Sequence, residues 1–163
     1  MTAGNHWTRI GVGLLVAAAT AGSAGLYFGQ YRVDQQTGEA AAKAVIAAAS
    51  DGSTALLSYT PDQLDSDLAA AKSHLTGEFL NYYSKFADEI VAPAAKERAI
   101  TTIASVARAA VAELHPDSAR VLVFLNQTTT SNAAPEPVQV ASIVNVSLSK
   151  VDAAWLISAF DPI

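Results

Sequence analysis

The side chains that could act as an acid, a base or a nucleophile are scattered along this sequence rather than arranged in a known motif. The candidates are His74, His115, Asp88, Glu89, Glu113, Tyr82 and Tyr83. Catalysis would need one titratable group in a pocket with a shifted pKa and a second group to orient it. His74 lies near a predicted break between helices, and His115 precedes Pro116 in a predicted turn, so both are interpreted as solvated loop residues. The sequence contains no phosphate-binding loop, metal-ligand spacing or nucleophile motif. It therefore predicts no catalytic residues, no cofactor and no metal site.

An acidic cluster, Asp62, Asp65 and Asp67, offers a possible cation site. The three carboxylates fall in the first turns of a predicted helix, where negative charge is favoured by the helix dipole. Helix capping is thus preferred over metal binding.

Aromatic residues recur through the second half of the chain and could form either a core or a lipid-sized pocket. They are Phe79, Tyr82, Tyr83, Phe86, Phe124, Trp155 and Phe160. A domain of this size needs a core, so the core interpretation is favoured. Because Tyr82 and Tyr83 are adjacent, on a helix they point about 100° apart and only one can face the interior fully. The other is predicted to be a contact or pocket residue.

These side chains must be held by a chain that begins with a long apolar stretch. Ile10 to Gly29 carries no charge and is flanked by Arg9 and Arg32. A helix of this length reaches about 30 Å, the thickness of the hydrocarbon core of a bilayer. A cleaved signal peptide is the alternative, with a possible site at Ala19-Thr20-Ala21. The uncleaved anchor is favoured because the apolar run continues beyond that site. We expect a cell-membrane protein with residues 1–9 in the cytoplasm, one span at 10–29, and an extracytoplasmic part from residue 30.

Small residues recur on one face of this predicted span. Ala17, Ala21, Gly25 and Gly29 lie four residues apart and would allow two helices to approach closely in lipid. The abundance of Ala and Gly in the whole chain is the competing explanation. The pattern predicts a partner helix in the membrane.

The part after the anchor is acidic. It holds 9 Lys and Arg against 15 Asp and Glu, a net charge of −6. Such a surface argues against nucleic acid as a partner. There is no cysteine, which excludes disulfides and thiolate metal sites. The roughly 134 residues are enough for one domain with its own core.

Helical signals fill the first part of this domain. A helix is predicted from Val33 to Ser50, within an extension at 30–53, and Asp51-Gly52 is interpreted as its end. Thr60-Pro61-Asp62-Gln63 resembles a capping box that starts a long amphipathic helix. Gly77 is predicted to divide that helix into two, and Pro93 to end or kink the second.

Strand signals fill the second part. Alternating apolar residues predict a strand at 138–149, and a short connection at 150–153 leads to a strand at 154–160, which together form an antiparallel hairpin. The run at 119–130 predicts an inner strand, followed by a loop at 131–137. The segment 100–114 fits a helix or a strand, and periodicity alone favours a helix.

Several segments of residues 57–162 are similar to the Mce-associated membrane protein family of actinobacteria, single-pass proteins related to the Mce lipid-import systems. The matching segments are 57–59 (LSY), 67–86 (DLAAAKSHLTGEFLNYYSKF), 91–96 (VAPAAK), 113–118 (ELHPDS), 123–129 (VFLNQTT) and 155–162 (WLISAFDP). The resemblance implies an α+β fold: an NTF2-like or VirB8-like domain at 54–163, with helices packed on a curved antiparallel sheet of about four strands. It also makes 100–114 the first strand.

The same resemblance implies a function, and the lack of a catalytic motif in the sequence predicts that this function is non-catalytic. We expect an accessory or stabilising subunit of an Mce-type transporter of fatty acids or sterols, in contact with its permease subunits, its Mce subunits and indirectly its ATPase. The residues predicted to bind partners are those of the Ala17/Ala21/Gly25/Gly29 face, with Tyr82 and Tyr83 as outer-domain contact or pocket residues. An independent NTF2-like lipid-binding or enzymatic domain is the alternative. A scaffold in a secretion-type assembly is a third possibility, by fold analogy alone.

Overall fold

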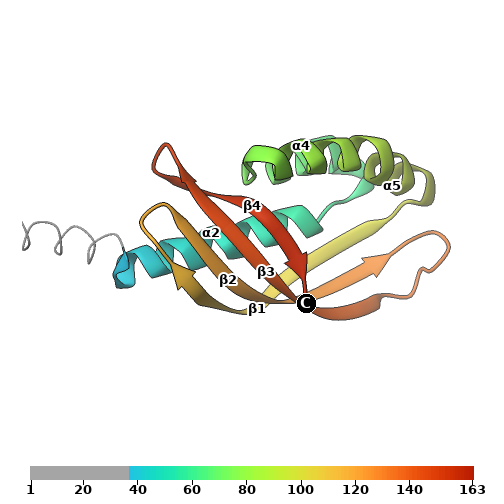
Figure 1. Ribbon diagram of the computed structural model, residues 1–163. Helices are drawn as coiled ribbons and strands as arrows, with labels where there is room; N and C mark the ends of the chain where they lie inside the picture. Colours follow the sequence, from blue (N-terminus) through green and yellow to red (C-terminus); the bar gives the residue numbers. More distant parts are fainter. Residues whose placement is uncertain (1–36) are drawn as a thin grey trace, which may run out of the picture.

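The computed structural model describes residues 37–163, which form an α+β domain (Figure 1). The helices are α2 (Glu39–Leu57), α3 (Leu64–Ser73), α4 (Gly77–Phe86) and α5 (Ala92–Arg98). The strands are β1 (Thr101–Leu114), β2 (Ser118–Thr130), β3 (Val138–Val151) and β4 (Ala154–Pro162). The predicted span at 10–29, its small-residue face and the tail at 1–9 lie outside the described residues. Within residues 37–163, no helix is both long enough and apolar enough to cross a membrane.

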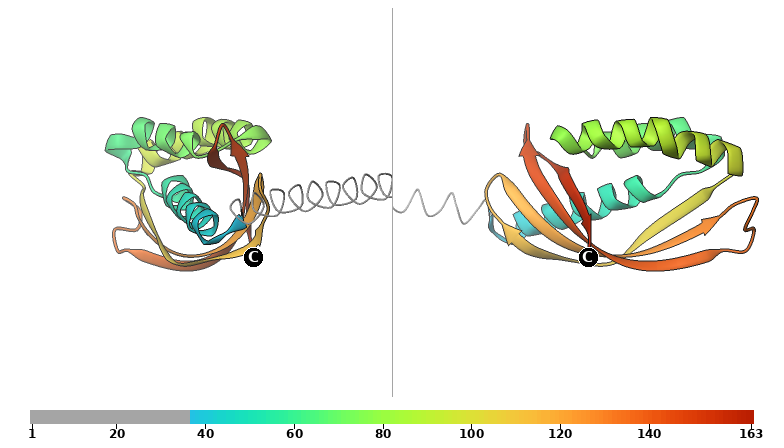
Figure 2. Two further views of the ribbon diagram at one scale, coloured as in Figure 1. Left: turned by 90° about the vertical axis from the view of Figure 1, so that its left-hand side faces the viewer. Right: turned by 45° about the vertical axis from the view of Figure 1, so that its right-hand side comes forward.

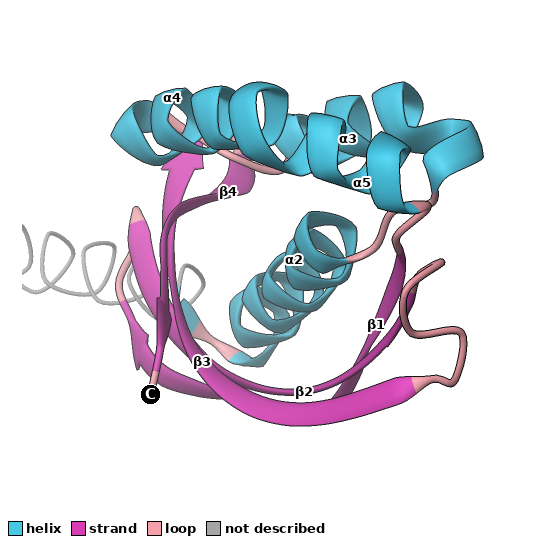
Figure 3. Ribbon diagram, turned by 90° about the vertical axis from the view of Figure 1, so that its right-hand side faces the viewer, coloured by secondary structure: helices cyan, strands magenta, loops and turns pink. Residues whose placement is uncertain are grey.

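The four strands form one antiparallel sheet in the order β1-β2-β3-β4. The sheet curves around α2, which lies in its hollow and contacts every strand, and α3, α4 and α5 cross over the open side (Figure 3). The core is formed where Val45 and Ala49 of α2 meet the inward-facing residues of the strands, among them Val121, Val123 and Val146. The predicted fold class, helices packed on a curved antiparallel sheet, is confirmed.

The segment that periodicity alone would make a helix is strand β1. The strand interpretation, which came from the family resemblance, is confirmed, and the helix interpretation is wrong. Pairing with β2 along the whole of β1 supplies the backbone hydrogen bonds that a helix would otherwise provide. The β-branched residues Thr102 and Ile103 suit this extended backbone, with Thr102 buried and Ile103 exposed on the opposite face.

Helix α2 does not end at Asp51-Gly52 as predicted, but continues to Leu57. Gly52 is buried, and a Cβ atom placed on it would lie 2.6 Å from Cδ1 of Ile157 in β4. The glycine is therefore present because the helix approaches the sheet too closely for a side chain, not because the helix stops there.

The capping box predicted at Thr60 is also absent. Pro61–Gln63 forms a 3₁₀ turn before α3, and the backbone N–H of Thr60 donates to Oδ2 of Asp67 at 3.0 Å. A carboxylate one turn into the helix thus takes the place that Gln63 was predicted to fill.

The other two helix signals, Gly77 and Pro93, have different outcomes. Gly77 separates α3 from α4 with a φ of +63°, a backbone conformation that glycine adopts without strain. Pro93 does not end the helical segment. It follows a π-helical turn, Ala87–Val91, and stands in the first turn of α5. The wider turn accommodates a residue that has no N–H to donate.

The predicted β3–β4 hairpin is confirmed. Its connection is the two-residue turn Asp152-Ala153, in which both residues have positive φ angles of 48° and 68°, as a type I′ turn requires. Strand β3 is longer than β4, so the C-terminus, just after the end of β4, lies beside the middle of β3 (Figures 1 and 2).

Candidate functional site

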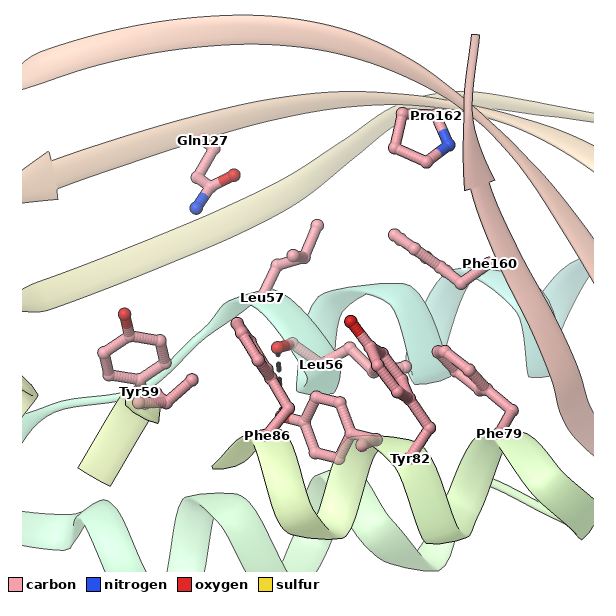
Figure 4. Close-up of a pocket in the computed structure, with 11 residues that line it drawn as sticks. Leu56, Leu57, Tyr59, Phe79, Tyr82, Phe86, Gln127, Phe160 and Pro162 are labelled. Carbon is pink, nitrogen blue, oxygen red and sulfur yellow. Dashed lines mark hydrogen bonds between the residues drawn. The ribbon is translucent and has the colours of Figure 1, made fainter. Parts of the chain in front are cut away.

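An open pocket of about 440 Å³ lies between α4 and the concave face of the sheet (Figure 4). It is lined by Leu56, Leu57, Tyr59, Phe79, Tyr82, Tyr83, Phe86, Val91, Gln127, Phe160 and Pro162. The end of α2 supplies the two leucines, α4 supplies four aromatic rings, and the sheet supplies Gln127, Phe160 and Pro162. We call this the aromatic pocket.

The wall from α4 is built by helical spacing. Phe79, Tyr82 and Phe86 are three or four residues apart, so their side chains emerge on one side of the helix, and Tyr83 lies beside this row, turned toward the interior. The ring of Tyr82 stacks between its neighbours, with centroids 6.4 Å from Phe79 and 6.2 Å from Phe86. Figure 4 shows these three rings projecting from α4 toward Gln127 and Pro162 on the sheet.

Tyr83 is the buried member of this wall. Its hydroxyl donates to the carbonyl oxygen of Leu56 near the end of α2 at 3.3 Å, the contact drawn as a dashed line in Figure 4. Burial, with a smaller contribution from the neighbouring Tyr59, raises the pKa of Tyr83 to about 12. The hydroxyl therefore stays protonated and ties α4 to α2.

Tyr82 lies at the mouth of the pocket. Its residue surface is 62% exposed, against 7% for Tyr83, so the two adjacent tyrosines face outward and inward respectively. Both line the aromatic pocket.

The other predicted aromatic residues separate into different environments. Phe160 joins the pocket, whereas Phe124 is exposed on the convex face of β2 and Trp155 packs at the edge of the core beside Lys150. The favoured interpretation of these rings as a core holds for Tyr83, which is buried, and for Phe79, Trp155 and Phe160, which pack against the core. It is wrong for the exposed rings of Tyr82, Phe86 and Phe124. Within residues 37–163, Tyr83 is the member of that group that is fully buried.

The chemistry of the pocket is that of an uncharged apolar surface. Its lining contains no acidic, basic or histidine side chain, and its polar groups are the Tyr hydroxyls and the Gln127 carboxamide. Such a surface favours an apolar occupant, and apart from its tyrosines it offers no titratable side chain for proton transfer.

The candidate acids and bases are kept apart. His115 is exposed in the β1–β2 turn, and His74 ends α3. Asp88 is paired with Lys72 at 2.9 Å, and Glu113 with Arg120 at 2.8 Å. Glu89 is exposed on the π-helical turn. None of these residues lines the aromatic pocket.

The acidic cluster is occupied with local interactions. Asp65 pairs with Lys96 at 3.2 Å, and Asp67 accepts from Thr60. No group of acidic, His or Cys side chains among residues 37–163 is arranged to hold a metal ion.

Sequence reasoning missed most of the pocket residues outside α4, although Phe160 was among its aromatic candidates. Leu56, Leu57, Gln127 and Pro162 are distant in sequence and have no motif in common. The mild signal was Gln127, an uncharged polar residue that continues the row of inward-facing apolar residues Val121, Val123 and Leu125.

Comparison with curated proteins finds close relatives in Mycobacterium tuberculosis. The chain is 57% identical over 151 residues to the uncharacterized protein Rv1362c, covering 92% of this chain and 69% of that protein. It is 42% identical over 160 residues to the outer membrane protein Rv1973, covering 96% of this chain and 99% of that protein. This chain belongs to their family. No protein-family model matches it.

Solved structures share the fold of this family member at low sequence identity. The periplasmic domain of DotI has a TM-score of 0.62 at 20% identity, covering 74% of this chain and 94% of that domain. VirB8 of Agrobacterium tumefaciens has a TM-score of 0.57 at 11% identity, covering 74% of this chain and 90% of its own. CagV, a VirB8 homologue of Helicobacter pylori, has a TM-score of 0.58 at 10% identity, covering 74% and 96%. The predicted VirB8-like fold is thereby confirmed.

Proposed function

We propose that the protein is a non-catalytic, membrane-anchored accessory subunit of an Mce-type lipid transport complex, and that its outer domain works by binding protein partners. One observation carries the proposal: the domain exposes an apolar stripe on α4 and the following π-helical turn, in the absence of any catalytic arrangement among residues 37–163. The stripe consists of Tyr82, Phe86 and Ile90.

The exposed stripe places apolar side chains in contact with water, which is unfavourable unless a partner covers them. Its residues follow at intervals of four along one helical face, and Ile90 is 57% exposed. Contiguous apolar surface on a small domain is typical of a binding site, because covering it releases ordered water. The aromatic pocket lies beside Tyr82 and Phe86 and extends this surface inward.

The envelope location is supported by the sequence and by a relative's name. The uncharged stretch at 10–29 predicts a membrane anchor with an extracytoplasmic domain. One close relative is named an outer membrane protein. The Mce assignment itself rests on the family resemblance over residues 57–162, with the permease, the Mce subunits and indirectly the ATPase as partners.

The test is recovery of the transporter subunits with tagged full-length protein from native membranes in mild detergent. We expect Gly25→Leu to lower recovery of the permease by about tenfold or more, because a bulky side chain would separate helices that meet on the small-residue face. Ser23→Leu is the matched control, since it adds the same side chain away from that face. Equal recovery with both variants, or recovery of no Mce or permease subunit with the unmodified protein, would overturn the proposal.

A second function is favoured by the aromatic pocket. Its volume and uncharged lining suit an acyl chain, as expected of an independent lipid-binding domain. Native mass spectrometry of the purified full-length protein distinguishes the two: a bound lipid without partner subunits supports the second function.

A further inference from the structure

The first half of strand β3 has a strand neighbour on one side only. Strand β3 pairs with β2 from Val138 onward, but it pairs with β4 only from Val144, which lies opposite Pro162. Residues 138–143 therefore run past the end of the sheet's last strand (Figure 2). We call this segment the free edge.

The backbone groups that point outward from the free edge can be assigned from one hydrogen bond. The N–H of Ile163 donates to the carbonyl oxygen of Ile143 at 3.0 Å, so residue 143 directs its backbone groups away from β2. Alternate residues of a strand direct their groups to the same side. Gln139 and Ala141 therefore present N–H and C=O groups outward, and no residue in 37–163 pairs with them.

The outer edge of β1 is protected. Its register is broken by irregularities at Val106/Arg108 and Val111/Glu113, and two of these residues carry charges. Tyr59 also pairs with Thr102 at one end. Bulges, charges and cover are the usual means by which proteins prevent another strand from adding to an edge.

The outer edge of β4 is covered as well. Ile157 donates to the carbonyl of His74 at 2.8 Å and accepts from the N–H of Thr76 at 2.9 Å, so the loop after α3 occupies this edge. The strand then ends in Asp161 and Pro162. The free edge has none of these features: residues 138–143 contain no charge and no proline, and their pairing with β2 has no bulge.

The free edge adjoins the aromatic pocket. Val140 is opposite Gln127 and Val144 is opposite Pro162, and both Gln127 and Pro162 line the pocket. These pairs define two rows of side chains across the sheet, one through Val140 and Gln127 and one through Val144 and Pro162. A strand added beyond the end of β4 would place the residue opposite Ser142 between these two rows. Its inward side chain would enter the mouth of the pocket, next to Val138 and Val140, which are 54% and 56% exposed on the same face.

We propose that an uncharged, extended segment of another protein adds to the sheet as a strand along residues 138–143 and inserts an apolar side chain into the aromatic pocket. The outward N–H and C=O groups select a polypeptide, because a hydrocarbon chain has no hydrogen-bonding groups to pair with them. The lack of charged side chains at the site favours an uncharged segment. Neither the free edge nor the pocket lining has a charged residue, so a charged segment would lose hydration without gaining a counter-charge.

The inference rests on the proposed function only in assigning the outer domain a protein partner. It does not require that partner to belong to an Mce complex. The two therefore fail separately: a docked segment from an unrelated protein would overturn the transporter assignment and leave the docking mode standing.

The test uses a photoreactive p-benzoylphenylalanine in place of Val138 in the full-length protein, irradiated in its native membranes. Crosslinked peptides are then sequenced by mass spectrometry. The same probe in place of Ile103 is the control, because that residue is exposed on the opposite face of the sheet. We expect the probe at 138, and not at 103, to join to one uncharged segment of another protein.

Variants in the same background decide whether the segment docks as a strand. Ala141→Pro removes one outward N–H and leaves the pairing with β2 intact, so it should lower the crosslink yield about tenfold. Ala141→Val keeps that N–H and should leave the yield unchanged. Val140→Lys, which adds a charge and no backbone change, should also lower the yield and covers the case in which the proline variant does not fold.

Three results would overturn the proposal. They are crosslinks from position 138 to a second copy of this chain, crosslinks to lipid alone, and a yield that Ala141→Pro and Val140→Lys leave unchanged in folded protein. The first would make the free edge a self-association surface, and the second would assign the pocket to an acyl chain.

Discussion

The hydroxyl of Tyr83 joins two helices through a buried contact. It donates to the Leu56 carbonyl, one of the last in α2, where backbone acceptors have no partner within the helix. Removing the hydroxyl would leave this acceptor without that donor. The same burial keeps the phenol protonated well above its ordinary pKa of 10.0.

Tyr83→Phe should lower the free energy of unfolding by about 1 kcal/mol at neutral pH, the net value of a buried hydrogen bond. The difference between the two proteins should shrink as the pH rises from 10.0 toward about 12, because the unfolded wild-type chain loses its Tyr83 proton first. The raised pKa thus contributes stability below pH 10.0 that is lost through this window. Urea denaturation at a series of pH values measures it.

Tyr82→Phe is the matched control for this experiment, because its hydroxyl belongs to an exposed ring at the pocket mouth. It should change the unfolding free energy at neutral pH by no more than about 0.5 kcal/mol. Curves for wild-type and Tyr83→Phe that stay parallel through the alkaline range would contradict the buried-donor assignment.

At this scale the sequence predicted a difference between the two tyrosines but not its direction. Helical geometry alone requires adjacent residues to diverge. Which of them faces inward depends on where α4 lies against the end of α2, and that position is fixed by contacts between segments far apart in the chain.

At the level of elements, the contact between α2 and β4 depends on a missing side chain. A Cβ at Gly52 would lie 2.6 Å from Cδ1 of Ile157 and 3.3 Å from Cβ of His74. Ile157 is fully buried, so its side chain has little room to move. The helix and the strand are therefore packed against each other's backbone.

Gly52→Ala should destabilise the protein by about 1 kcal/mol, because overpacking of about 1–3 kcal/mol exceeds the gain of about 1 kcal/mol in helix propensity. Ile157→Val, which removes the clashing Cδ1, should cost about 0.5–1.5 kcal/mol by itself. The double variant should then be more stable than the sum of the two single effects, and thermal or denaturant unfolding of all four proteins measures this coupling. Strict additivity would show that the two residues do not collide.

Gly52 and Thr60 were the two residues at which the predicted helix boundaries were wrong. The sequence predicts a helix end at Asp51-Gly52, but Gly52 lies within α2. The sequence does not distinguish a glycine needed for close packing from one needed for a turn. Thr60 has the spacing of a capping box, yet it bonds to Asp67. The strand at 138–149 was predicted well because alternation reports burial on one face directly. The strands at 119–130 and 154–160 were predicted from a continuous apolar run and from a short hairpin connection, and both are present.

For the molecule as a whole, the pocket could not be predicted from the sequence. Its walls come from the end of α2, from α4 and from two strands, and their meeting depends on the curvature of the sheet around α2 (Figure 3). The rings of α4 carried the only periodic signal. The free edge likewise follows from a difference in length between β3 and β4, which local patterns do not report.

The exposed stripe and the free edge lie on opposite sides of the same pocket. Tyr82 and Phe86 border it from α4, and the free edge meets it through the rows of Gln127 and Pro162. One docked segment can therefore contact both, pairing its backbone with β3 while its inward side chain reaches Tyr82. Two separate partners would contact them independently.

Tyr82→Ser and Ala141→Pro should consequently be coupled. The crosslinked segment is made as a labelled synthetic peptide and titrated with the full-length protein. Each single variant of the protein should bind the peptide more weakly than the wild type, because Tyr82→Ser removes part of the pocket wall and Ala141→Pro removes an N–H donor from the free edge. The double variant should lose less than the sum, with a coupling energy of about 0.5–3 kcal/mol, since the second change acts on a segment already displaced. Ile103→Ser, on the opposite face, should be additive with Ala141→Pro within about 0.5 kcal/mol. Additivity of Tyr82→Ser with Ala141→Pro in titrations by fluorescence anisotropy would mean that stripe and edge serve different partners.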